Sequence, residues 1–183
     1  MPNRAFIGIG TNLGDRAAHY REAIQRLAAL PDTRIVRQSS IYETEPVGDV
    51  KGPFLNGVVE VETEMPADAL MRRLLAIERT MGRRRPARKP SARRRYQARV
   101  IDLDLLFFNK EVVQTRSLVL PHPRLHERRF VLAPMAELAP ALIHPKLNVS
   151  ISDLLANLKS PHRVTLARAD LLRPAARREV VTR

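Results

Sequence analysis

The chain contains no cysteine, few aromatic residues and no long apolar run. Without cysteine there can be no disulfide, no thiolate metal site and no cysteine nucleophile. An aromatic fraction of 4%, with no cluster of Phe or Tyr, argues against a surface that stacks RNA bases. No segment approaches the roughly 20 apolar residues of a membrane span, and only a short apolar stretch precedes Thr11. We therefore expect a soluble, cytoplasmic protein without a membrane partner.

The net charge of +13 is concentrated in two segments of an otherwise neutral chain. Residues 83–99 contain nine Lys or Arg and no acidic residue, and the segment from Ser160 to the end contains six Arg and two acidic residues. Because the charge is local, it does not by itself indicate a nucleic-acid partner. The length of 183 residues and the hydrophobic fraction of 44% predict one domain over 1–160. Residues 161–183 are expected to form a flexible basic tail.

Apolar residues recur with the period of a strand in some segments and of a helix in others. These patterns predict strands over 5–9, 34–42, 56–63 and 100–108, helices over 16–30, 66–82, 131–138 and 151–158, and a hairpin strand over 111–114 after a turn at 109–110. Asp15 and Ser150 are suited to begin helices as N-caps, and Gly82 to end one. The order up to residue 108 is βαββαβ. That is the order of a ferredoxin-like α+β sandwich, with helices on one face of an antiparallel sheet.

The most unusual feature is a pair of aspartates, Asp102 and Asp104, inside the apolar segment RVIDLDLLFFN. Side chains two apart on a strand point the same way, so both carboxylates crowd one face, roughly 7 Å apart along the chain. One interpretation pairs each carboxylate with an arginine as a structural feature. The other is a Mg²⁺ site, in which two aspartates and the oxygens of a polyphosphate hold the metal.

The basic segment 83–99 directly precedes this strand. Arginine makes bidentate contacts with phosphate oxygens, so the segment suits a nucleoside triphosphate bound beside the aspartates. Composition alone leaves a nonspecific nucleic-acid arm equally open. Pro86 and Pro90 argue against a helix here, and we expect the segment to be mobile until an anionic ligand binds.

Two further segments, residues 8–14 and 121–130, contain residue types that can contact phosphates. The glycine-rich segment GIGTNLG, residues 8–14, matches neither the P-loop nor the dinucleotide fingerprint, and we interpret it as a close-packed turn from strand to helix. The segment PHPRLHERRF, residues 121–130, brings His122, Arg128 and Phe130 close together along the chain. A single histidine is more often structural, but a histidine and an arginine here can reach the same phosphates.

Five segments in order resemble the 6-hydroxymethyl-7,8-dihydropterin pyrophosphokinase family. They are FIGIGTNLGDR, YETEPVG with FLNGVV, E-x₃-GR-x-R, RVIDLDLL and LPHPRLHERRFVLAPMAELAP, and they cover about residues 5–158. The resemblance implies a ferredoxin-like fold, and transfer of pyrophosphate from MgATP to the hydroxymethyl group of the pterin, with release of AMP. It also implies two bound Mg²⁺ ions, small-molecule substrates and a place in folate biosynthesis. We expect a monomer, with no nucleic-acid partner.

The resemblance also carries over roles for single residues. It implies Asp102 and Asp104 as metal ligands and Arg83 and Arg99 as the arginines that assist transfer. Further residues correspond to positions that contact ATP: Glu78, Arg85, His122 and Arg128. Others correspond to the pterin pocket: Thr44, Val47, Asn56 and the aromatic pair Phe54 and Phe130, between which the flat ring would stack.

The chain departs from the family pattern before the aspartates. Where the family usually has Trp-Gly-Pro-Arg, this sequence has Tyr96, Gln97, Ala98 and Arg99, and the segment between Arg83 and Arg99 is about six residues longer than in shorter members. These changes affect the alignment of Arg85 and leave the aspartate pair untouched. The competing hypothesis is a nonenzymatic RNA- or ribosome-binding module on the same fold.

Overall fold

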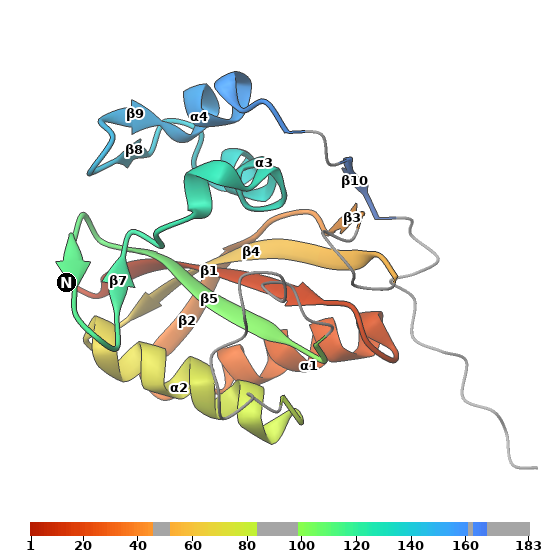
Figure 1. The fold of residues 1–183 in the computed structure, drawn as a ribbon. Helices are drawn as coiled ribbons and strands as arrows, with labels where there is room; N and C mark the ends of the chain where they lie inside the picture. The colour runs from red at the N-terminus through yellow and green to blue at the C-terminus, as the bar shows by residue number, and fades with distance from the viewer. Residues whose placement is uncertain (46–51, 84–98, 161–162, 168–183) are drawn as a thin grey trace, which may run out of the picture.

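The computed structural model describes residues 1–45, 52–83, 99–160 and 163–167. The helices are interspersed among the strands along the chain (Figure 1). Their bounds are β1 Asn3–Thr11, α1 Arg16–Ala28, β2 Thr33–Gln38, β3 Tyr42–Thr44, β4 Phe54–Thr63, α2 Ala67–Thr80, β5 Asp102–Phe108, β6 Val113–Gln114, β7 Val119–Leu120, η2 Leu125–Glu127, α3 Arg129–Leu138, β8 Ile143–His144, β9 Val149–Ser150, α4 Ile151–Asn157 and β10 Val164–Leu166. The mixed α+β class is as expected from the sequence.

The main sheet is antiparallel and six-stranded, in the order β10-β3-β4-β1-β5, with β2 also paired to β4. The sequence predicted one strand over 34–42, but the chain forms two, because it bends at Ser39. The Ser39 hydroxyl oxygen accepts from the Val58 N–H (2.9 Å) and the hydroxyl donates to the Ser40 carbonyl (2.7 Å). The strands β2 and β3 therefore pair with different halves of β4.

Helices cover both faces of the sheet, with α1 and α2 on one face and α3 and α4 on the other (Figure 1). The side chains of the sheet form two cores, one on each face, and a shift in the pairing of β1 with β5 lets the consecutive residues Leu106 and Phe107 share one of them. The Leu103 and Leu105 side chains pack toward α1 and α2, whereas Leu106 and Phe107 pack toward α3. The prediction of two helices on one face is confirmed for α1 and α2. The cover formed by α3 and α4 on the opposite face was not anticipated.

The helix boundaries follow the capping signals. The Asp15 carboxylate accepts from the Ala18 N–H (2.9 Å) at the start of α1, and Ser150 Oγ accepts from the Asp153 N–H (3.1 Å) at the start of α4. Gly82 follows α2 with φ of +89°, a conformation that glycine adopts without steric cost. These three predictions are confirmed.

Two predictions, one for the segment after β5 and one for the glycine-rich segment at residues 8–14, are wrong. The segment after β5 does not form a hairpin with it, because β6 pairs with β7 and not with β5. Gly8 and Gly10 are not part of a turn, because they lie within β1. Only Gly14, with φ of +62°, lies in the turn toward α1.

Part of the predicted tail belongs to the sheet. Residues 164–166 form β10 and pair with β3. The expected mobility of residues 83–99 and of most of the tail lies outside the described residues, and the division at residue 160 stays a prediction. Within the described part of the chain, no helix has both the length and the apolar character needed to span a membrane.

Gly57 on β4 provides a test of the packing between the sheet and α1. A Cβ at this position would overlap the hydroxyl oxygen of buried Tyr20 and lie 3.3 Å from Ser39 Oγ. We expect Gly57→Ala to lower the free energy of unfolding by about 1–3 kcal/mol, because an overpacked core must shift. Urea denaturation would measure the loss.

A second substitution controls for the cause. The Tyr20 hydroxyl has no hydrogen-bond partner among the described residues, so Tyr20→Phe alone is expected to change stability little. In combination with Gly57→Ala it should restore part of the lost stability. Equal losses for Gly57→Ala in both backgrounds would contradict this account.

Candidate active site

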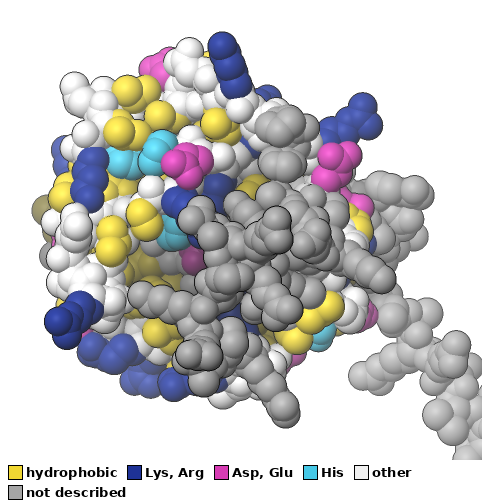
Figure 2. All heavy atoms as spheres, in the orientation of Figure 1, with side chains coloured by type: hydrophobic (Ala, Val, Ile, Leu, Met, Phe, Trp, Pro, Cys, Tyr) yellow, Lys and Arg dark blue, Asp and Glu magenta, His cyan; other side chains and the backbone are white. Residues whose placement is uncertain are grey.

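A cleft of about 370 Å³ lies along β1, β4 and β5, and its lining includes Met71 of α2 and Phe130 of α3. Its walls come from β1, β3, β4, β5 and the segment between β7 and α3. Figure 2 shows basic side chains and a histidine gathered close to an acidic side chain on this surface. The lining combines apolar side chains with several charged ones, as is common in small-molecule sites.

Asp102 and Asp104 both line this cleft, on the same face of β5 as the buried Leu106. The register of β1 against β5 sets Gly10 opposite Asp102 and Gly8 opposite Asp104. Because the partners on β1 lack side chains, the space over the carboxylates stays open. A Cβ on Gly10 would lie 3.2 Å from Asn56 Oδ1 and 3.9 Å from Asp102 Cβ. The glycine-rich segment therefore shapes the floor of the cleft, which the sequence analysis missed.

Two arginines hold Asp102. Arg83 Nη1 contacts Asp102 Oδ1, and Arg99 Nη1 contacts Asp102 Oδ2. Burial alone would raise the pKa of this carboxyl group, but the Arg99 and Arg83 guanidinium groups hold its pKa below the ordinary value. One interpretation of the sequence paired each aspartate with an arginine. Asp102 has such partners, and they lie inside the cleft.

Asp104 has weaker partners. Its Oδ2 lies 3.4 Å from Arg128 Nη1 and 3.8 Å from His122 Nε2. Burial and the negative charge of Asp102 raise the pKa of Asp104 to about 6, despite attraction to Arg128. Two carboxylates of the same strand therefore have opposite electrostatic environments.

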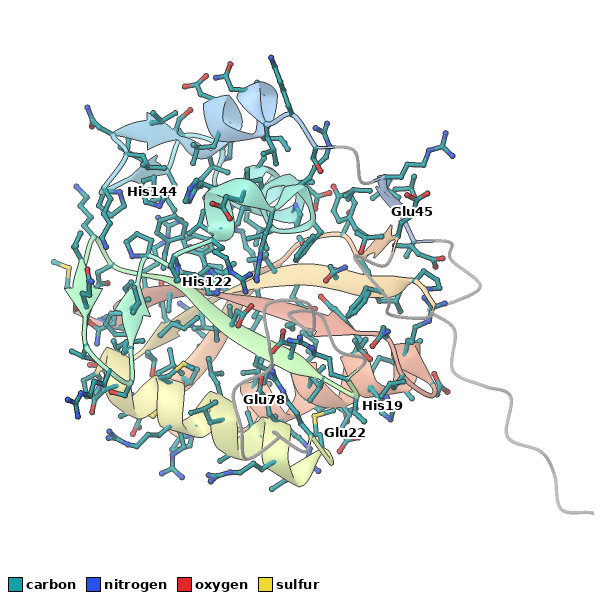
Figure 3. All side chains as sticks on the ribbon, in the orientation of Figure 1. His19, Glu22, Glu45, Glu78, His122 and His144 are labelled. Carbon is teal, nitrogen blue, oxygen red and sulfur yellow. The ribbon has the colours of Figure 1, made fainter. Side chains whose placement is uncertain are left out.

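His122 is held as a neutral imidazole. Burial, followed by the charges of Arg128 and Arg124, lowers its pKa to about 4. His122 Nδ1 accepts from the Arg124 N–H (3.2 Å), which leaves the ring proton on Nε2, facing Asp104. Figure 3 shows His122 above β5, on the side of the sheet opposite Glu78.

Glu78 does not line the cleft. It belongs to α2, is 1% exposed, and its side chain reaches the backbone of β5 (Figure 3). Its Oε1 accepts from the Leu103 N–H (2.8 Å) and contacts Arg83 Nη1. Glu78 therefore touches both the backbone between the two aspartates and the arginine that holds one of them.

Asn12, in the turn after β1, holds the backbone of Arg99. Asn12 Oδ1 accepts from the Arg99 N–H (2.8 Å), and the Asn12 N–H donates to the Arg99 carbonyl (3.2 Å). Asn12 is 7% exposed. This role of Asn12 was not predicted, since nothing in a single sequence links positions 12 and 99.

The other end of the cleft holds the residues carried over to the pterin pocket. Asn56 Nδ2 donates to Thr44 Oγ1 (2.8 Å), and both side chains are buried. Phe54 and Phe130 also line the cleft, and the Arg128 guanidinium lies 5.6 Å from the centre of the Phe130 ring. The remaining two positions, Val47 and Arg85, lie outside the described residues.

The donor set fits a magnesium ion bound together with phosphates. Within the described ranges no group of three or more His, Asp or Glu side chains could hold a metal ion alone. Two carboxylates suit Mg²⁺, which takes its other ligands from substrate phosphates and water. Buried Arg128 Nε has no hydrogen-bond partner among the described residues, so a donor remains available for an anion beside Asp104.

A family model described as 7,8-dihydro-6-hydroxymethylpterin-pyrophosphokinase matches residues 6–140. This chain belongs to that family. A 2-amino-4-hydroxy-6-hydroxymethyldihydropteridine pyrophosphokinase of Bacillus subtilis is 41% identical over 139 residues, which are 75% of this chain and 79% of the relative. One of the same name from Methylorubrum extorquens is 43% identical over 141 residues, which are 76% of this chain and 85% of the relative. The family's pyrophosphate transfer from ATP to hydroxymethyldihydropterin, in folate biosynthesis, is therefore the activity of this enzyme.

Solved structures agree on the fold. The crystal structure of wild-type Plasmodium falciparum HPPK-DHPS matches with a TM-score of 0.64 at 17% identity, over 85% of this chain. This chain spans 44% of that longer protein, so the likeness concerns the fold of the shared part alone. The comparisons do not support the RNA-binding alternative.

Proposed function

We propose that the cleft transfers pyrophosphate from ATP to the pterin hydroxymethyl group, releases AMP, and uses two Mg²⁺ ions held by Asp102 and Asp104. The observation that carries this proposal is the pair of carboxylates on one face of β5, opposite two glycines and surrounded by arginines. A polyphosphate that brings strong negative charge would meet Arg83, Arg99, Arg128 and His122 at this point.

In the proposed reaction the pterin hydroxyl oxygen forms a bond to the β-phosphorus of ATP. The bond from that phosphorus to the oxygen bridging to the α-phosphorus breaks, the hydroxyl loses its proton to solvent, and AMP leaves. When bound, Mg²⁺ would lower the pKa of the pterin hydroxyl group and neutralise negative charge on the phosphates. No side chain is required as a general base in this scheme.

The arginines are assigned to the charge on the phosphates. Arg83 and Arg99 reach the same carboxylate, so both guanidinium groups lie beside the proposed metal. Fixed cations at a site where charge shifts in the transition state contribute strongly to catalysis. Neutral His122, with its proton on Nε2, is assigned as a hydrogen-bond donor to a phosphate oxygen.

Glu78 is assigned a positioning role in place of the ATP contact carried over from the family. Its 1% exposure and its contacts with Arg83 and the Leu103 N–H support this assignment. It would act on the reaction through Arg83 and through the backbone between the aspartates.

The pterin is assigned to the other end of the cleft. An amide such as Asn56 offers both a donor and an acceptor to the ring edge, and Phe54 and Phe130 line the same space for stacking. We further propose that the frame is ferredoxin-like, which is supported by the strand order β5-β1-β4 followed by β2 and β3. Location in the cytoplasm and a monomeric state remain predictions.

The nucleotide product tests this function. Full-length enzyme, ATP, Mg²⁺ and hydroxymethyldihydropterin should yield AMP and pterin diphosphate in equal amounts, measured by ion-exchange chromatography. Omission of Mg²⁺ with added EDTA should stop both. Formation of ADP, or no turnover, would contradict the proposal.

A further inference from the structure

Strand β10 lies beyond residue 140, where the match to the family model ends, and it pairs with β3. The register sets Val164 opposite Thr44. Backbone bonds extend the pairing at both ends, because the Glu45 N–H donates to the Arg163 carbonyl (3.4 Å) and the Ala167 N–H donates to the Ile41 carbonyl (2.8 Å). Figure 1 shows β10 beside β3, and Figure 3 shows Glu45 close to both. The segment 163–167 thus borders all of β3.

Strand β3 is short and carries part of the cleft wall. It spans three residues, and its last residue, Thr44, is 4% exposed and accepts the hydrogen bond from Asn56. Its other contacts include the pairing with β4, the bond of the Tyr42 hydroxyl to Glu137 on α3, and the ion pair of Glu43 with Arg16 on α1 (3.7 Å). Without β10, β3 would be an edge strand, and short edge segments open readily.

We infer that β10 is a positioning element for the pterin site. By pairing with β3 it holds Thr44 against Asn56, so that the amide of Asn56 presents a fixed donor and acceptor to a flat heterocycle. This inference rests on the proposed function, which assigns the pterin edge to these two residues. The proposed ATP end of the cleft lies on β5, which β1, β4 and β3 separate from β10 in the sheet.

The register identifies a matched pair of substitutions. Arg163 and Ala167 direct backbone groups toward β3, and residues two apart on a strand share that direction. The backbone N–H of Thr165 therefore faces β3, whereas that of Leu166 faces away. The Thr165 hydroxyl also reaches the Glu43 carbonyl (3.5 Å), while Leu166 is 63% exposed. Proline removes an N–H at either position and fits only where that N–H is not paired.

The test compares Thr165→Pro with Leu166→Pro in the full chain. We expect Thr165→Pro to raise the KM for hydroxymethyldihydropterin about fivefold to tenfold, the loss associated with a backbone hydrogen bond and its neighbours. Its KM for ATP and its kcat should stay within about twofold of the parent enzyme. Leu166→Pro should stay within about twofold in all three constants.

The outcomes separate this inference from the proposed function. A parent enzyme that forms no AMP refutes the proposed function. An active parent for which both variants show the same pterin KM refutes only the role of β10. A lower melting temperature for Thr165→Pro with unchanged constants shows a merely structural strand and also refutes the inference.

A measurement without any variant covers the case in which Thr165→Pro does not fold. Hydrogen exchange of the full chain reports on the Glu45 and Ala167 amides, which donate across the β3–β10 pairing. Binding of pterin with an unreactive ATP analogue should slow their exchange at least about threefold relative to the nucleotide analogue alone. Unchanged exchange would contradict the coupling of β10 to the pterin site.

Discussion

Replacing Asp104 with asparagine is expected to lower kcat at least about 10³-fold without loss of stability. The loss of activity follows because metal-held charge contributes several kcal/mol to the transition state, and each 1.36 kcal/mol is tenfold in rate. Stability should not fall, because burial and the charge of Asp102 raise the pKa of Asp104 to about 6. Above that pH the folded protein holds an ionised group that it disfavours, so a neutral side chain removes this cost.

The same substitution at Asp102 should differ in its effect on stability. Asp102→Asn is expected to lower kcat to a similar extent, but also to lower the free energy of unfolding by about 1–3 kcal/mol. The Asp102 carboxylate forms ion pairs with Arg83 and Arg99. Without it, two half-buried cations would lack a partner, which lowers the stability of the folded state. We therefore expect Asp102→Asn to lower stability and Asp104→Asn not to lower it, although both aspartates are proposed as metal ligands.

Steady-state kinetics together with urea denaturation in EDTA at pH 7.5 measure both effects. A matched control is Asp153→Asn, on the exposed first turn of α4, which should leave kcat unchanged. Turnover within about tenfold of the parent for either variant in the cleft would contradict its role as a metal ligand. Equal destabilisation by both would contradict the electrostatic difference between them.

The second large effect concerns Glu78 and Arg83. Arg83→Ala is expected to lower kcat about 10²- to 10³-fold, the cost of one fixed donor at a site of developing charge. Glu78→Gln keeps an oxygen that can accept from the Leu103 N–H but removes the charge that holds Arg83, and should lower kcat about tenfold. Because Glu78 acts through Arg83, the double variant should match Arg83→Ala alone.

Kinetics of the four proteins in this cycle measure the coupling between the two residues. The control is Glu22→Gln, which removes the charge from a half-buried glutamate paired with Arg26 on α1, away from the cleft lining, and should not change kcat. Additive losses in the double variant would show that Glu78 acts independently of Arg83. A lower melting temperature with unchanged kcat would show that Glu78 has only a structural role.

Local signals made much of the fold predictable. Asp15, Ser150 and Gly82 mark helix ends because each acts on the backbone within a few residues. The prediction of a hairpin after β5 was wrong because strand pairing there does not depend on local signals. Nothing local distinguishes pairing of β6 with β5 from pairing with β7, because the choice depends on which partner completes the packing.

In the candidate site, too, the local pattern could be predicted from the sequence and the tertiary contacts could not. The alternation around Asp102 and Asp104 was enough to predict that the two carboxylates share one face of the strand. It could not reveal that Gly8 and Gly10 lie opposite, or that Glu78 and Asn12 hold the two arginines. The Asn12–Arg99 contact and the bond from the Leu103 N–H to Glu78 join positions far apart in the sequence, and the glycines lie across strands, so these contacts depend on tertiary register. The Glu78–Arg83 contact spans only five residues, but it depends on the course of the chain after the end of α2.

A crystal structure of the full chain with Mg²⁺, an unreactive ATP analogue and hydroxymethylpterin tests the proposed site directly. We expect metal density bound by Asp102 and Asp104, and the triphosphate within reach of Arg83, Arg99 and Arg128. The pterin ring should lie beside Asn56, between Phe54 and Phe130. A nucleotide bound elsewhere, or metal-free aspartates still paired to the two arginines beneath a bound triphosphate, would contradict the proposed site.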